Sequence, residues 1–181
     1  MALFIARICI YQLAHAFDPA HQTIWWHLIG NMLYLWVFGN NIEDAMGHVR
    51  FLIFYLLCGA CAALINAGVE PDSIVPTIGA SGAVSGVLGA YLVLHPRSRV
   101  LVLIFLGFFI QTVRLPAVIV LGFWIVLQLF SAVTESAETS GVAVFAHIGG
   151  FIAGMVLIGL FRRRDLGSVD HGNGDGPWGQ R

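Results

Sequence analysis

Four polar residues in otherwise apolar stretches of the sequence have the chemistry for acyl transfer: Ser81, His147, His27 and Asn31. A serine hydroxyl becomes a nucleophile when a base within hydrogen-bonding reach takes its proton, and His147 is the candidate base. His27 and Asn31 are four residues apart, so on a helix they share one face. From there they would donate hydrogen bonds to the oxyanion of a tetrahedral intermediate, with the Ser81 backbone N–H as a third donor. These residues predict a serine hydrolase that uses a Ser81–His147 dyad.

A dyad is expected because no carboxylate is placed to complete a Ser-His-acid triad. Glu43 and Asp44 follow the first apolar stretch, at the end expected to lie away from Ser81, and the other acids fall in loops. Ser85, one turn after Ser81, is an alternative nucleophile, although it lacks a glycine two residues before it. Simpler interpretations also stand: small residues serve helix packing, and a histidine inside a membrane can line an ion path.

The composition is that of a protein which crosses the membrane several times. Hydrophobic residues make up 58% of the chain, charged residues make up 10%, and the mean hydropathy is +0.83. Soluble domains carry about 25% charged residues. The net charge of -1 is uninformative here, but no basic patch with interleaved aromatic residues occurs, so no nucleic acid partner is expected. Cys58 and Cys61 have a C-x-x-C spacing but lie in an apolar run without a second pair, so no metal and no cofactor are expected.

The apolar stretches predict an all-α transmembrane helix bundle. A span needs about 20 apolar residues, and five stretches approach this length: 24–41, 51–67, 77–94, 115–133 and 142–161. A sixth stretch, 100–113, is too short and is predicted to be interfacial or re-entrant. The expected organisation is an interfacial segment over 1–23, one membrane domain over 24–164, and a disordered cytoplasmic tail over 165–181.

The distribution of charge predicts the orientation of the spans. With five crossings the arginines of the loops share one side: Arg50, Arg97, Arg99, Arg114 and Arg162 to Arg164. The loop acids share the other side: Glu70, Asp72, Glu135 and Glu138. Because basic residues mark the cytoplasmic face, we expect a multi-pass protein, in the plasma membrane, whose C-terminus is cytoplasmic.

The same count places the candidate site. Ser81, His147 and His27 all fall near the outer ends of their spans, which gives them a common depth and side. If 100–113 crossed the membrane, His147 would lie on the opposite face from Ser81. Small residues should let the helix that carries Ser81 and the helix that carries His147 approach each other closely. The residues expected to have this structural role are Gly79, Gly82, Gly150 and Gly154.

In three ordered motifs the chain resembles the rhomboid family of intramembrane serine proteases. The motifs are His27-Leu28-Ile29-Gly30-Asn31, Gly79-Ala80-Ser81-Gly82, and Ala146-His147-Ile148-Gly149-Gly150 with Gly154. The resemblance covers about residues 12 to 164. It implies an endopeptidase that cuts transmembrane protein substrates near the outer face of the bilayer, without metal or nucleotide. It also implies Ser81 as nucleophile, His147 as base, and His27 and Asn31 as oxyanion donors.

Two departures from the family pattern bear on this interpretation. The family core has six spans, of which five are visible here, and residues 1–23 resemble the end of the loop after the first. Some members place an aromatic residue four positions after the nucleophile, against the catalytic histidine; here that position is Ser85, so another group must hold the His147 ring. The alternatives are a non-catalytic rhomboid-like protein that binds client transmembrane helices, and a channel or transporter that uses the histidines.

Overall fold

The computed structural model describes residues 22–69, 71, 80–106, 109–134 and 144–163 of the chain. Its elements are α2 (Gln22–Tyr34), the π-helical η2 (Leu35–Gly39), α3 (Asn40–Met46), α4 (His48–Val69), α5 (Ser81–Leu94), β1 (Arg99–Leu106), β2 (Phe109–Pro116), α6 (Ala117–Thr134) and α8 (Val144–Phe161). The expectations for the segment 1–23, apart from its last two residues, for Gly79 and for the tail 165–181 lie outside the described residues.

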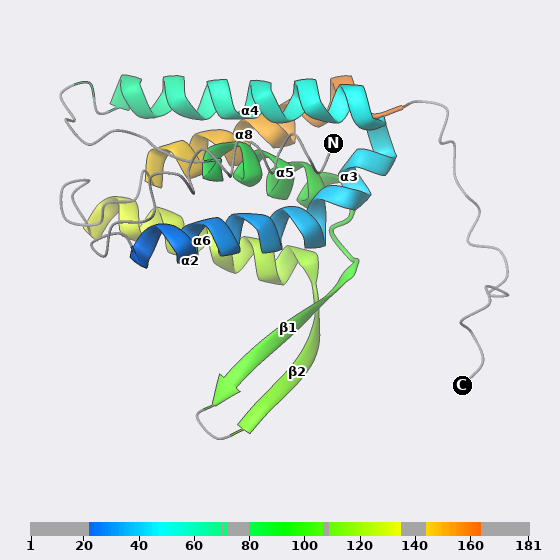
Figure 1. Ribbon diagram of the computed structural model, residues 1–181, viewed down its shortest axis with the longest axis vertical. Helices are drawn as coiled ribbons and strands as arrows, with labels where there is room; N and C mark the ends of the chain where they lie inside the picture. Colours follow the sequence, from blue (N-terminus) through cyan, green and yellow to red (C-terminus); the bar gives the residue numbers. More distant parts are fainter. Residues whose placement is uncertain (1–21, 70, 72–79, 107–108, 135–143, 164–181) are drawn as a thin grey trace, which may run out of the picture.

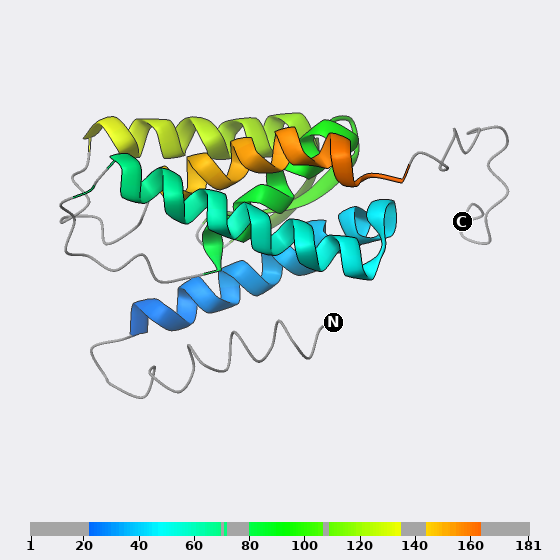
Figure 2. The same cartoon turned by 90° about the horizontal axis from the view of Figure 1, so that it is seen from above.

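The helices form a bundle around α5 (Figure 1). Ten consecutive residues of α5, from Gly82 to Tyr91, are buried, and α2, α4, α6 and α8 all contact this helix. A helix that is apolar on every face is stable where other helices surround it. Seen from above, α8 lies between α6 and α4 (Figure 2), and it contacts both. The predicted helical membrane fold is therefore confirmed.

Three of these helices are long and apolar enough to cross a bilayer: α4, α6 and α8. The fourth apolar helix, α5, has only 14 residues, since Ala80 is its N-cap and the helix begins at Ser81. The first predicted span, 24–41, is longer in the structure, since α2, η2 and α3 follow one another without a break to Met46. Glu43 and Asp44 therefore lie inside α3 instead of closing the span.

The turn between α3 and α4 is fixed by Gly47. Its φ of 85° and ψ of 161° place it in a backbone region that only glycine occupies readily. The guanidinium of Arg163, just after α8, lies against this glycine, and the Arg163 backbone N–H donates to the carbonyl oxygen of Ala45 at 3.0 Å. This contact joins the beginning of α4 to the end of α8.

Between α5 and α6 the chain forms an antiparallel β-hairpin, which extends away from the helices (Figure 1). The strands are in register from Arg99 opposite Pro116. At the base of the hairpin, the backbone N–H of Ala117 donates to the carbonyl oxygen of Ser98 at 2.8 Å. The chain thus returns to the end of the bundle from which it left. This agrees with the prediction that 100–113 is an interfacial or re-entrant segment and not a crossing. That the segment forms two β-strands was not predicted.

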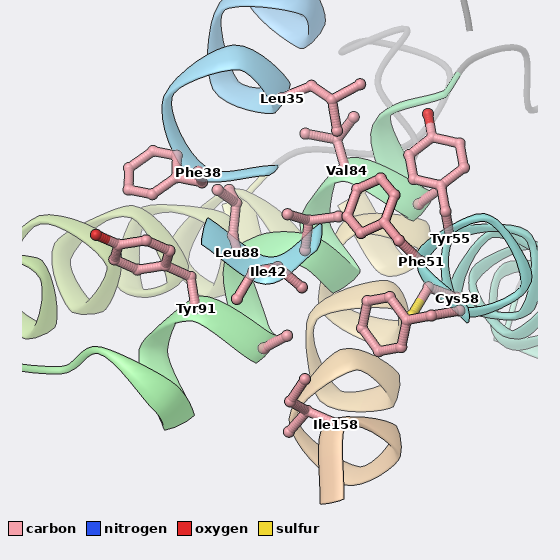
Figure 3. Close-up of a cluster of buried hydrophobic side chains, with 14 of the residues drawn as sticks. Leu35, Phe38, Ile42, Phe51, Tyr55, Cys58, Val84, Leu88, Tyr91 and Ile158 are labelled. Atoms are coloured by element: carbon pink, nitrogen blue, oxygen red, sulfur yellow. The ribbon is translucent and has the colours of Figure 1, made fainter. Parts of the chain in front are cut away.

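The hydrophobic core is richest in large side chains at the end of the bundle away from Ser81. The ring of Phe38 packs edge-on against Tyr91, with ring centres 4.9 Å apart, and Phe54 packs against Phe161 at 5.7 Å. Figure 3 shows side chains from five elements meeting there: Leu35, Phe38, Ile42, Phe51, Tyr55, Cys58, Val84, Leu88, Tyr91 and Ile158. This core fixes the helices at one end, and glycine contacts take over toward the Ser81 end.

Candidate active site

Glycines bring the helices that carry Ser81 and His147 into backbone contact. A Cβ atom added at Gly150 would overlap the carbonyl oxygen of Gly82, and one added at Gly82 would lie 3.4 Å from the carbonyl oxygen of Ala146. Ser81 directly precedes Gly82, and His147 directly follows Ala146. The structure therefore places the two candidate catalytic residues on adjacent segments of α5 and α8, at the same end of the bundle.

The contact continues along both helices. A Cβ atom at Gly154 would overlap the carbonyl oxygen of Gly86, and one at Gly89 would overlap that of Phe151. The pairs advance together along the two helices, so α5 and α8 run parallel. Helix α4 runs the other way, because Ala62 faces Gly82 while Cys58 faces Gly86. The C-terminal end of α4 and the N-terminal ends of α5 and α8 thus surround the candidate site.

Ser81 is the first residue of α5 and is half-buried. Its neighbour one turn later, Ser85, is only 2% exposed, and the Ser85 hydroxyl donates to the carbonyl oxygen of Ser81 at 2.7 Å. A hydroxyl that is enclosed and already bonded to its own helix has no room for a peptide carbonyl. Access therefore favours Ser81 over Ser85 as the nucleophile.

The imidazole of His147 is held by two side chains of α6. The Nδ1 atom of His147 lies 3.1 Å from the Oε1 atom of Gln128, within hydrogen-bonding distance. One turn earlier on α6, the ring of Trp124 lies 6.1 Å from the imidazole, centre to centre, at 43°. Among the described residues no hydrogen bond joins His147 to Ser81; in proteases without substrate this bond is often long and tightens on binding.

Neither Gln128 nor Trp124 was predicted as a residue of the site. A signal for Gln128 was present, because it is the polar residue in the middle of an apolar span. Such residues usually have a partner or a function. Its partner could not be identified from the sequence, since the facing position on α8 depends on how the two helices are packed.

The two candidate oxyanion donors lie on α2, which also contacts α5. Asn31 is half-buried and shares the inward face with Leu28 and Leu35, both of which are buried. His27 is exposed, on the flank of the same helix, and interacts electrostatically with His147. Asn31 therefore lies on the face of α2 that packs against the bundle and His27 on its exposed flank, while Gly79 lies outside the described residues.

The side chains at this end include groups that acyl transfer requires. Within the described ranges, no group of three histidine, cysteine or acidic side chains is close enough together to hold a metal ion. Cys58 and Cys61 are both free thiols. The arrangement brings together the Ser81 hydroxyl, the His147 imidazole, whose Nδ1 is within hydrogen-bonding distance of Gln128, and the Asn31 amide on α2.

Comparison with known proteins identifies the family that shares these features. A family model described as the Rhomboid domain matches residues 19–164, which is most of the chain and includes every helix and strand described above. No solved structure matches the chain.

Several named relatives are similar in sequence. Rhomboid-like protein 11, chloroplastic, of Arabidopsis thaliana is 29% identical over 176 residues, covering 87% of this chain and 58% of the relative. Rhomboid protease GluP of Bacillus subtilis is 33% identical over 148 residues, covering 79% and 26%. Rhomboid protein 1, mitochondrial, of Saccharomyces cerevisiae is 37% identical over 90 residues, covering 48% and 26%. The matched region thus spans less than two thirds of each of these relatives.

Proposed function

Since this chain belongs to the rhomboid family, we propose that it is an intramembrane serine endopeptidase that cleaves membrane-anchored proteins. The observation that supports this most directly is the backbone contact between Gly82 and Gly150, which sets Ser81 and His147 on adjacent segments. A similar protein, GluP, is named as a rhomboid protease. The family assignment supports the class of protein. The contact between Gly82 and Gly150 supports a geometry in which His147 could activate the Ser81 hydroxyl.

In the proposed reaction the Ser81 Oγ atom attacks the carbonyl carbon of the scissile peptide bond, and its proton passes to Nε2 of His147. The negative charge that develops on the carbonyl oxygen is stabilised by Asn31, His27 and the Ser81 backbone N–H. Collapse of the intermediate breaks the C–N bond, and the proton on His147 goes to the departing amine. Water then hydrolyses the Ser81 ester with the same imidazole as base.

The proposed substrates are proteins anchored by a transmembrane helix, cut near the outer face of the bilayer. The arginines support this orientation: Arg50, Arg97, Arg99, Arg162 and Arg163 lie at or just beyond the helix ends opposite Ser81. Basic residues favour the cytoplasmic side, which leaves Ser81 at the outer end. The compartments named for the relatives are the chloroplast and the mitochondrion, so the expected plasma membrane location stays a prediction.

Cleavage of a single-span reporter in membranes tests the proposal. Ser81→Ala and His147→Ala should each abolish cleavage, because each removes one half of the dyad. Ser85→Ala is the matched control: its hydroxyl is enclosed and bonded to the helix backbone, so this variant should cleave at close to the native rate. Undiminished cleavage by both dyad variants would refute the proposal.

A serine-directed fluorophosphonate separates the protease from a non-catalytic protein that only binds client helices. An activated Ser81 should become labelled, and the label should disappear in Ser81→Ala and in His147→Ala. Reporter binding without any labelling of Ser81 would point to the non-catalytic function. Ion flux in proteoliposomes that persists in Ser81→Ala would point to a channel.

A further inference from the structure

We infer that Gln128 is the positioning residue of this site, holding His147 in the tautomer that a base requires. The inference rests on the proposed function, because it assigns a role next to the proposed base. Gln128 lies on α6, whereas Ser81 and His147 lie on α5 and α8. A residue on a third helix, α6, would thus orient the base of the dyad.

The chemistry follows from which atom faces the ring. The Oε1 atom of Gln128 is a hydrogen-bond acceptor, so Nδ1 of His147 must carry the proton that it accepts. A neutral imidazole has only one N–H, which leaves Nε2 unprotonated and able to take the Ser81 proton. In serine protease triads a carboxylate on Nδ1 has the same orienting effect, and in one class of cysteine proteases a neutral asparagine side chain supplies it.

The surroundings of His147 show why α6 is the helix that can do this. Ser85 occupies the position one turn after Ser81, and its hydroxyl is bonded to the α5 backbone, so α5 offers no aromatic ring to the imidazole. Trp124 supplies a ring from α6 instead, at 6.1 Å, and it also packs against Phe151 of α8 at 5.8 Å. Trp124 and Gln128 are four residues apart and therefore share the face of α6 that meets α8.

In the outer half of α6, Trp124 packs against Phe151 and Gln128 bonds to His147, so this face contacts α8. The buried residues of α6, Ala117 and Leu121, both lie in its first five positions, near the hairpin. Toward Thr134 the helix becomes exposed, as Leu127, Leu129 and Phe130 show. A hydrogen bond at this depth therefore fixes the imidazole and the helix against each other.

Kinetics of three variants test the inference. Gln128→Leu removes the acceptor with little change in volume, and should lower kcat about 10- to 100-fold, part of the 10²- to 10⁴-fold that a positioned base contributes. KM and the melting temperature should stay close to native. Gln128→Glu keeps an acceptor and should retain activity, with the acidic limb of its pH–rate profile moved to higher pH, because a carboxylate favours the protonated imidazole. Leu129→Ala, exposed on the same helix, is the control.

A spectroscopic measurement separates positioning from mere packing. With ¹⁵N-labelled histidine, the NMR signals of His147, assigned by their loss in His147→Ala, should show the Nδ1–H tautomer in the native protein. Gln128→Leu should shift the population toward Nε2–H. A native kcat in Gln128→Leu, or an Nε2–H tautomer of His147 in the native protein, would overturn the inference. Because the tautomer is read without substrate, a failure of the proposed function, seen as cleavage that survives Ser81→Ala, is distinguishable.

Discussion

At the scale of single residues, the two proposed oxyanion donors differ in how firmly the fold holds them. Asn31 is half-buried, on the inward face of α2, and His27 is exposed at its flank. A donor stabilises a transition state best when it is fixed before the reaction, since no reorganisation is then needed. The more enclosed amide should therefore contribute more than the exposed imidazole.

We predict that Asn31→Ala lowers kcat about 10²-fold, as the loss of one oxyanion donor does elsewhere, and that His27→Ala lowers it less. The measurement is reporter cleavage under saturating conditions, with fluorophosphonate labelling of Ser81 as a second readout. Asn40→Ala is the matched control: its side chain is exposed in α3 and donates to the carbonyl oxygen of Trp36, one turn earlier. A larger effect from His27→Ala than from Asn31→Ala would contradict the ranking.

The sequence pointed to the residues of the site but could not supply all of their partners. Ser81, His147, His27 and Asn31 were found because polar residues stand out in apolar stretches, and because charge counting gave them one depth. Gln128 escaped notice because its partner is 19 positions away on another helix. Which residue of α6 faces His147 depends on how α6 and α8 are rotated about their axes. Both helices are apolar on nearly every side, so the pattern of hydrophobic residues does not specify that rotation.

At the scale of elements, the approach of α5 and α8 depends on glycines whose hydrogen atoms face carbonyl oxygens. Of the glycines expected to have this role, Gly150 and Gly154 face the carbonyl oxygens of Gly82 and Gly86, whereas a Cβ atom at Gly82 would overlap Ala62 of α4. In a membrane, close backbone approach is a main source of helix association, since lipid tails are as apolar as the side chains. A methyl group there must push one backbone away from the other.

We predict that Gly154→Ala destabilises the protein by about 1–3 kcal/mol, the usual cost of overpacking, because its Cβ atom would overlap the Gly86 carbonyl oxygen. Gly159→Ala, in the same helix but with nothing within 4 Å of the added atom, is the control and should be nearly neutral. Thermal unfolding in detergent measures both. Equal melting temperatures for the two variants would show that α5 and α8 are not in backbone contact.

The hairpin shows where element prediction stopped. Its 14 predicted residues were too few for a span, and flanking arginines marked its ends, so its non-crossing nature could be predicted. Its strands could not, because short apolar runs are ambiguous between helix and strand when both faces are apolar. Leu101 and Leu103 are 63% and 61% exposed, and Leu101 pairs with Arg114 across the hairpin. This mixture of exposed leucine and arginine is typical of a membrane interface.

At the scale of the whole molecule, the hairpin places Ser81 and His147 at the same end of the bundle. The chain leaves α5 and enters α6 at one end of the bundle, as the bond from Ala117 to Ser98 shows. Helix α6 then runs back, and α8 begins beside Ser81. Had 99–116 crossed the membrane, the start of α8 would lie at the other face, and no packing could join the hydroxyl to the imidazole. The return of the chain at the hairpin is therefore what allows Ser81 and His147 to share one end of the bundle.

Orientation follows from the same arrangement and can be measured directly. We predict that alkaline phosphatase fused after residue 139, in the connection from α6 to α8, is active in bacterial membranes, whereas a fusion after Arg164 is inactive. A fluorescent protein, which folds in the cytoplasm, should give the opposite pattern. The reason is that the arginines gather at the end of the bundle that carries Arg163 and Gly47, and translocating them is unfavourable. The reverse pattern at both positions would turn Ser81 toward the cytoplasm and rule out cleavage near the outer face. A phosphatase active at both positions would mean that α8 does not cross the membrane, which would contradict the orientation, since α8 is long and apolar enough to span it.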